Sequence, residues 1–227
     1  MIRAVLFDYG GTLDSDGIPW IDRFYPIYRQ AGLRASWEDF RKAFFDADDH
    51  LPERFQLEGL DLEQTIARQV ACVAERLAPG ENDLSQAVVR RFVDSSREQL
   101  SRNRPLLESL RRRFLLGIVS NFYGNLEGIL EAEGLRPLFG VVADSARVGS
   151  MKPDKEIFLH AARSLGVRPE EALMVGDSLN RDMRGAEAAG MPHAWLAGER
   201  PAPEPCCPGT PVLRTLLDME AHIPQYS

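Results

Sequence analysis

The sequence predicts an α/β fold, a doubly wound parallel sheet with a Rossmann-like core and a helical insertion. Two observations predict it. Short apolar runs that end in Asp, Ser or Gly occur near both ends of the 227-residue chain, and a long stretch between them shows only helical periodicity. Continuous apolar runs are typical of parallel strands that are buried on both faces. The composition, 44% hydrophobic and 27% charged, is that of a globular chain.

Strands and helices alternate in the part of the chain that follows the insertion. Five apolar runs are candidate strands, at 4–7, 115–119, 141–142, 173–175 and 193–196. Helical patterns separate the later runs, at 105–113, 126–130 and 157–165. This alternation predicts a parallel sheet with right-handed crossovers. The Pro-containing stretch 201–211 predicts a loop near the C-terminus.

The stretch from about Ser15 to Arg102 has no strand pattern. Its apolar residues recur at spacings of three and four, as in Ile21, Phe24, Tyr25 and Tyr28. Such stripes predict amphipathic helices, four in this stretch, whose aromatic residues pack in a core. We therefore divide the chain into a core made of 1–14 and 103–227 and a helical insertion at 15–102.

Charge and cysteine content exclude several classes of protein. The net charge of −7 argues against a nucleic-acid binder, and no apolar run approaches the ~20 residues of a membrane span. The first apolar run meets Asp8 at once, unlike a signal peptide. Cys72, Cys206 and Cys207 form no disulfide framework, so a reducing cytoplasm is the expected compartment.

Reactive side chains follow several of the predicted strands. Ligands of doubly wound sheets bind at the carboxyl ends of the strands. Asp8, Ser120, Lys152 and Asp177 fall at or soon after such ends. One carboxylate can attack phosphorus, and a second can help to hold Mg²⁺. A hydroxyl and an ammonium group can bind phosphoryl oxygens, so the set suits a phosphoryl group with a divalent cation.

Four motifs carry a resemblance to a known family. They lie at 7–13, 118–121, 151–154 and 175–178, and Asp182 and the segment 185–191 follow the last one. In this order, each after an apolar run, they resemble the haloacid dehalogenase superfamily of hydrolases over essentially the whole chain. The insertion resembles the α-helical cap of its phosphatase-like branch.

The resemblance implies a role for each motif residue. Asp8 would be the nucleophile, Ser120 would hydrogen-bond the phosphoryl group, and Lys152 would offset the charge between them. Phosphate binding would also involve Gly11 and Asn121. For Mg²⁺, the implied ligands are Asp8, the backbone carbonyl of Gly10, and Asp177, with Asp182 nearby.

Gly10 is the important departure from the family. Phosphatases that the chain resembles carry a second aspartate there, two residues after the nucleophile, which protonates the leaving group and then activates water. Glycine has no proton to give, and the loss of an acid/base could remove ~10²–10⁴-fold of rate. Asp14 or Asp16 could substitute, although acids in such positions are usually turn or hinge residues.

The cap offers weaker candidates. Trp20, Arg23 and Arg54 could face the substrate. A cluster of three acids and one histidine follows Phe45, and we expect it to form a solvated helix end. Its members are Asp46, Asp48, Asp49 and His50.

These observations predict a Mg²⁺-dependent phosphatase that acts on a small phosphorylated metabolite through an aspartyl-phosphate, as a monomer or homodimer, with no nucleic-acid or membrane partner. A catalytically silent member that binds a phosphometabolite or a partner is one alternative. A 2-haloacid dehalogenase is another, but that branch usually has Tyr two residues after the nucleophile and Tyr9 is only one residue after it. Phosphonate cleavage would need a cap lysine, and the insertion contains only Lys42.

Overall fold

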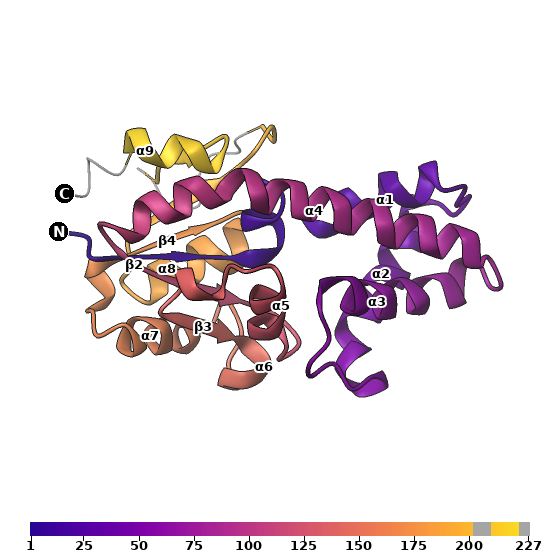
Figure 1. The fold of residues 1–227 in the computed structure, drawn as a ribbon, viewed down its shortest axis with the longest axis horizontal. Coiled ribbons are helices and arrows are strands. Elements are labelled where there is room, and N and C mark those ends of the chain that lie inside the picture. Colours follow the sequence, from indigo (N-terminus) through magenta and orange to yellow (C-terminus); the bar gives the residue numbers. More distant parts are fainter. Residues whose placement is uncertain (202–209, 223–227) are drawn as a thin grey trace.

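The central sheet has six parallel strands. The computed structural model describes residues 1–201 and 210–222. Within them the strand order is β3-β2-β1-β4-β5-β6 (Figure 1). The strands are β1 (Ala4–Phe7), β2 (Leu115–Ser120), β3 (Val141–Asp144), β4 (Ala172–Gly176), β5 (His193–Leu196) and β6 (Val212–Leu213). The predicted doubly wound sheet is confirmed, and the two-residue β6 is an addition that is too short to form a recognisable apolar run.

Helices cover both faces of the sheet. Alternate residues of β1 belong to different apolar clusters: Val5 and Phe7 pack in one, and Ala4 and Leu6 in the other. This alternation follows from the two-residue repeat of a strand. The helices of the core region are α5 (Leu126–Ala132), α6 (Ser145–Val148), α7 (Lys155–Ser164), α8 (Arg184–Ala188) and α9 (Met219–His222). The apolar residues of α5 and α9 join the first cluster, and those of α7 and α8 join the second.

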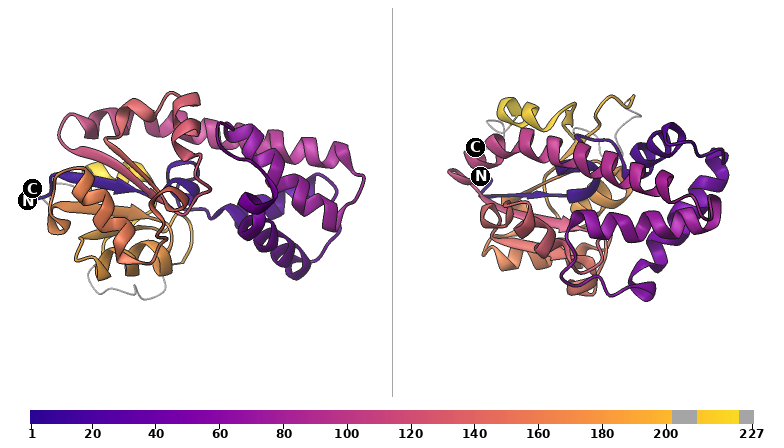
Figure 2. Two further views of the ribbon diagram at one scale, coloured as in Figure 1. Left: turned by 90° about the horizontal axis from the view of Figure 1, so that it is seen from below. Right: turned by 45° about the vertical axis from the view of Figure 1, so that its right-hand side comes forward.

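The insertion is helical, as predicted. It contains α1 (Trp20–Gln30), α2 (Trp37–Arg54), α3 (Leu62–Leu77) and the first part of α4 (Asn82–Arg111). Side-chain caps start two of these helices, because Ser36 accepts a hydrogen bond from Asp39 N and Asp61 accepts one from Gln64 N. The helices stand beyond one end of the sheet, opposite the N-terminus (Figures 1 and 2).

Helix α4 joins the insertion to the core without a break. Its 30 residues pass through the predicted boundary at 103, and Leu106, Leu107 and Leu110 are buried against the sheet region. Near this boundary Asn103 Nδ2 donates to Leu13 O at 2.9 Å. This hydrogen bond joins α4 to the segment where the chain first leaves the core for the insertion. The return to the core therefore lies inside a helix, and the division at 14/15 and 102/103 stays a prediction.

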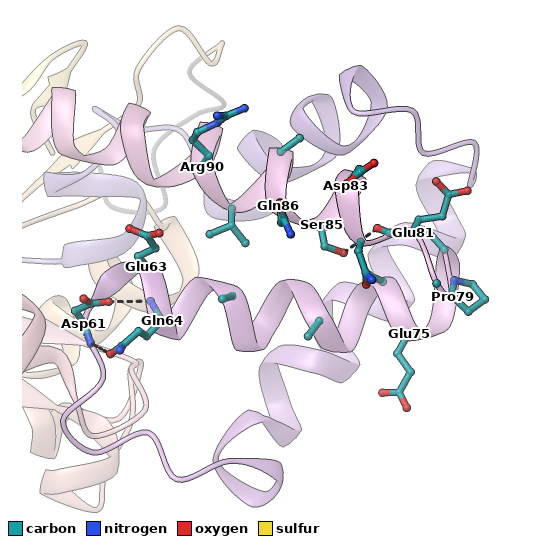
Figure 3. Close-up of a pocket in the computed structure, with 18 residues that line it drawn as sticks. Asp61, Glu63, Gln64, Glu75, Pro79, Glu81, Asp83, Ser85, Gln86 and Arg90 are labelled. Carbon is teal, nitrogen blue, oxygen red and sulfur yellow. Dashed lines mark hydrogen bonds between the residues drawn. The ribbon is translucent and has the colours of Figure 1, made fainter.

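An open groove of about 1170 Å³ lies between α3 and α4 (Figure 3). Alanines and acidic side chains line it, and none of its lining residues reaches the ends of the strands. No helix in the described part of the chain is both long and apolar enough to cross a bilayer. Cys206 and Cys207, and most of the predicted loop 201–211, lie outside the described residues.

Candidate active site at the carboxyl ends of the strands

Asp8 is the centre of the site. It follows β1 directly, and it is only 6% exposed. Ser120 Oγ, at the end of β2, donates to Asp8 Oδ1 at 2.8 Å, and Lys152 Nζ lies 2.7 Å from the same oxygen. Because β1 pairs in parallel with β2, these side chains meet at one edge of the sheet. The structure therefore brings together the three residues that the sequence predicts to be catalytic.

Lys152 is held at both its backbone and its ammonium group. Asn121 Nδ2 donates to Lys152 O at 3.0 Å, and Lys152 N donates to Asn121 Oδ1 at 2.7 Å. Lys152 Nζ also lies 2.7 Å from Asp182 Oδ1. Burial disfavours the charged ammonium, but Asp182 and Asp8 outweigh it and raise the pKa of Lys152 above its ordinary value. The Asn121 amide, predicted to bind phosphate, thus positions Lys152 in this structure.

Three buried carboxylates converge beside Lys152. Oxygen atoms of Asp8, Asp177 and Asp182 lie within 4.8 Å of one another. Burial, followed by the charges of Asp182 and Asp8, raises the pKa of Asp177 to about 8. The single charge of Lys152 offsets only part of the three negative charges, and carboxylate oxygens are the ligands that Mg²⁺ prefers. The residues present therefore fit a divalent metal ion.

Gly11 makes room for one of these acids. Its φ is +91°, and a Cβ there would lie 2.6 Å from Asp177 Oδ1. Only glycine accommodates both conditions without displacing the carboxylate. Gly11 N donates to Asp14 Oδ1 at 2.8 Å, so this donor is not directed at a phosphoryl group, which differs from the predicted phosphate-binding role.

Gly10 has ordinary backbone angles, with φ −75° and ψ 121°. A neighbour crowds the position instead: a Cβ would lie 3.0 Å from Trp20 Nε1 and 3.1 Å from Trp20 Cε2, so the indole would have to shift by a few tenths of an ångström. The indole of a cap residue thus lies directly beside the position where the family keeps its second aspartate.

Asp14 and Asp16, the predicted substitutes for that aspartate, both have other partners. Asp14 is fully buried, and its Oδ2 accepts from Trp20 Nε1 at 2.8 Å and lies 2.7 Å from Arg23 Nη1. Asp16 Oδ1 accepts from Leu216 N at 3.1 Å. Neither acid lines the cavity beside Asp8, and both join the entry of the insertion to neighbouring elements.

The cavity above Asp8 has a volume of about 110 Å³. This is below the ~300–1,000 Å³ of pockets that hold drug-sized ligands, so it suits a small substrate. The core and the cap region both contribute walls. The lining residues are Asp8, Gly10, Pro19, Trp20, Ile21, Phe44, Phe45, Asp48, Ser120, Asn121, Phe122, Tyr123, Lys152, Asp177 and Arg181.

The sequence analysis missed Asp48, Tyr123 and Arg181. The hydroxyl of Tyr123, in the loop after β2, donates to Asp48 Oδ1 of α2. Asp48 was expected on a solvated helix end, but it lies within α2 and lines the cavity. A signal was present, because Asp48 follows Phe44 by four residues and precedes Leu51 by three, which places a carboxylate on the apolar stripe.

The predicted cap candidates differ in their positions. Trp20 lines the cavity. Arg23 is turned away from it, since its guanidinium is held by Asp14 and by the hydroxyls of Ser95 and Ser96. Arg54 is a surface residue that pairs with Glu75 at 2.6 Å, and it does not line the cavity.

Comparisons with known proteins identify the family of this chain. Residues 2–190 match the family model for haloacid dehalogenase-like hydrolases. The chain is 35% identical over 171 residues to haloacid dehalogenase-like hydrolase domain-containing protein 3 of Bos taurus, which covers 74% of this chain and 64% of that protein. This chain therefore spans less than two thirds of the length of that relative.

A second relative matches over a larger share of its own length. Glyceraldehyde 3-phosphate phosphatase of Methanothermobacter thermautotrophicus is 35% identical over 198 residues, or 84% of each chain. Among solved structures, the magnesium-bound HAD-hydrolase YfnB of Bacillus subtilis superposes with a TM-score of 0.61 at 21% identity, covering 98% of this chain and 99% of that one. At this identity the likeness shows the fold alone. The family match, the shared fold and the two long alignments establish that this chain belongs to the haloacid dehalogenase-like hydrolases.

Proposed function

We propose that the protein is a Mg²⁺-dependent phosphatase of a small phosphorylated metabolite, with Asp8 as the nucleophile. The observation that carries this proposal is the arrangement around Asp8 Oδ1, where Ser120 Oγ lies at 2.8 Å and Lys152 Nζ at 2.7 Å. A carboxylate flanked by a hydroxyl and an ammonium group can attack phosphorus while both neighbours bind phosphoryl oxygens. The phosphatase names of relatives support a small phosphate ester as the substrate class.

Asp8, Asp177, Asp182 and the carbonyl of Gly10 would hold Mg²⁺, which when bound offsets the negative charge of the phosphoryl group and of the acids. The remaining roles belong to side chains of this chain. Asp8 forms a bond to phosphorus while the bond from phosphorus to the leaving oxygen breaks. Lys152 holds a positive charge beside Asp8 and the phosphoryl oxygens during this step. Asn121 fixes the backbone of Lys152 and so sets the position of its ammonium group.

The small cavity and the absence of a side chain at Gly10 restrict the proposed substrates. Acyl phosphates and aryl phosphate esters have weakly basic leaving groups and depend least on an acid, whereas an alkyl phosphate such as glyceraldehyde 3-phosphate needs a proton donor other than residue 10. Phosphonate cleavage is not supported, since Lys42 pairs with Glu38 at the surface, outside the cavity. A cytoplasmic location and a monomeric or homodimeric state remain part of the proposal.

The test is hydrolysis of acetyl phosphate, 4-nitrophenyl phosphate and glyceraldehyde 3-phosphate with Mg²⁺ or with EDTA. We expect phosphate release only with Mg²⁺, complete loss in Asp8→Asn, and a phosphoryl adduct on Asp8 in rapidly quenched samples. Release of chloride from chloroacetate in EDTA, without phosphate release, would identify a dehalogenase. Binding of phosphate esters without turnover or adduct would identify a silent member.

A further inference from the structure

Gly10 has no side chain that could give a proton to the leaving oxygen, so another group in the cavity must do so if the leaving group is basic. An acid for this step must face the same space as Asp8. Among the described residues, the titratable side chains that line the cavity are Asp8, Asp48, Tyr123, Lys152, Asp177 and Arg181.

Four of these groups are already committed. Asp8 is the proposed nucleophile, and Asp177 belongs to the acidic cluster that fits a metal ion. The ammonium group of Lys152 is paired with both Asp8 and Asp182 at 2.7 Å. Arg181 stays protonated at any working pH and so cannot cycle between acid and base. The pair formed by Asp48 and Tyr123 remains.

We propose that Asp48, carried by cap helix α2, is the general acid and base of this site, and that Tyr123 positions it. The inference rests on the proposed function and adds to it a catalytic residue outside the core. Tyr123 O–H donates to Asp48 Oδ1, so one carboxyl oxygen is fixed and the other can face the leaving group. Trp20 occupies the space beside Gly10, and Asp48 lines the same cavity from α2.

The proton balance closes with this one residue. In the first step Asp8 forms a bond to phosphorus, the bond from phosphorus to the leaving oxygen breaks, and that oxygen takes the proton of Asp48. In the second step the Asp48 carboxylate takes a proton from water as the water oxygen attacks phosphorus. The bond from phosphorus to Asp8 then breaks, inorganic phosphate leaves, and both carboxyl groups return to their starting states.

The surroundings of Asp48 suit this cycle. Burial raises the pKa of Asp48, and Asp49 on the same helix adds to the rise, while the Tyr123 hydroxyl and Arg181 lower it. Burial is the largest of these effects, so the carboxyl group keeps its proton to a higher pH than a solvated aspartate does. Asp8, Asp177 and Lys152 line the same cavity. Asp48 belongs to the cap and Asp8 to the core. The proposed acid can therefore reach the leaving oxygen only while the cap is packed against the core.

The experiment compares Asp48→Asn with Asp49→Asn. Asparagine keeps the size of the side chain and can still accept from Tyr123, but it has no proton to transfer. Asp49 is the exposed neighbour on the same helix and does not line the cavity, so Asp49→Asn is the matched control for the dependence on the leaving group. Because the charge of Asp49 raises the pKa of Asp48, this control should keep the pH limb and move it toward lower pH. Both variants are checked for folding by circular dichroism and melting temperature. The substrates, all with Mg²⁺, are 4-nitrophenyl, phenyl and ethyl phosphate, in order of increasing leaving-group basicity.

We expect Asp48→Asn to lower kcat/KM for phenyl and ethyl phosphate by ~10²–10⁴-fold, and to affect the first step with 4-nitrophenyl phosphate much less. The wild-type kcat/KM should fall as the pH rises through the pKa of Asp48, because the acid must be protonated, and the variant should lose this limb. With 4-nitrophenyl phosphate the variant should accumulate phosphorylated Asp8, seen as a mass increase of one phosphoryl group, since its water is not activated. Tyr123→Phe should show a weaker form of the same pattern.

An equal loss on all three substrates, with an unchanged pH profile and no adduct, would overturn the acid/base role and leave Asp48 as a substrate contact or structural residue. The same result in Asp49→Asn as in Asp48→Asn would also overturn it. If the wild-type protein releases phosphate from none of these esters, the proposed function fails and this inference fails with it. If the wild-type protein is active and Asp48→Asn matches it on every substrate, only this inference fails.

Discussion

Asp8 and Asp48 line the same cavity, but they reach it from two different regions of the molecule. Asp8 follows a buried strand whose neighbours in the sheet fix its place through the backbone. Asp48 lies on one face of α2, and its place depends on how that helix packs over the core. The comparison teaches that the sheet places the proposed nucleophile, whereas the cavity walls from the cap and the proposed acid depend on packing between two regions.

The largest expected effect is a loss of stability on removing a buried charge from the core site, compared with removing an exposed charge from the cap. Lys152→Met removes the cation between Asp8 and Asp182, all of them buried. Breaking a buried ion pair from one side leaves uncompensated charge, so we expect the free energy of unfolding to fall by ~3–5 kcal/mol. Urea denaturation in EDTA measures it.

The control for this prediction is a cap pair of similar length, Arg54 and Glu75, whose side chains are 45% and 68% exposed. Solvent screens such a pair, so Arg54→Gln should cost at most ~1 kcal/mol. Equal losses in the two variants would contradict the distinction between a charged core and a solvated cap surface.

A second, smaller effect concerns the contact between the regions at Gly10. Gly10→Ala places a methyl group 3.0 Å from Trp20 Nε1, and overpacking of this kind costs ~1–3 kcal/mol of the free energy of unfolding. In a Trp20→Leu background the same substitution should cost less than ~0.5 kcal/mol, because the indole is gone. A double-mutant cycle in urea measures the coupling, and an unchanged cost in both backgrounds would show that the indole does not limit this position.

The smallest expected effect is a change in KM on shortening Phe45, a side chain of the cap that lines the cavity. Phe45 lines the cavity and is 42% exposed, so part of its ring is free to contact a substrate. Phe45→Ala should raise KM for phenyl phosphate by ~5- to 30-fold, equivalent to about 1–2 kcal/mol of apolar contact, with kcat unchanged. Acetyl phosphate, which has little apolar surface, is the control substrate. A fall in kcat on both substrates would place Phe45 in the chemistry instead of the walls.

Much of the core site could be predicted from the sequence. Asp8 and Asp177 each end a short apolar run, and the carboxyl ends of parallel strands share one edge of a sheet. Local pattern and sheet geometry therefore suffice to bring these acids together. They do not suffice for the hydrogen bonds of Asn121 and Gly11, which depend on how the loops after the strands settle against one another.

The cap part of the site could not be predicted in the same way. The spacing of Trp37, Phe40 and Phe44 predicts a helix and its apolar stripe, but not which core loop lies opposite each turn. Tyr123 is 75 residues away from Asp48 in sequence, and only the packing of the two regions joins them. Arg54 shows the converse, since an arginine in the cap is as plausible as Asp48 from composition, yet it faces solvent.

Helix α4 gives the cap the mechanics of a lever. At the α-helical rise per residue, the part of α4 between Pro105 and Asn82 spans about 35 Å, so a tilt of about 5° at Pro105 would move the far end by about 3 Å. Pro105, inside the helix, cannot donate a hydrogen bond to the carbonyl of Ser101, so the rod is weakest close to where it leaves the core. A displacement of about 3 Å is enough to separate a hydrogen-bonded donor from its acceptor. A pivot at this one turn would therefore change the contacts between cap and core while the rest of α4 stays helical.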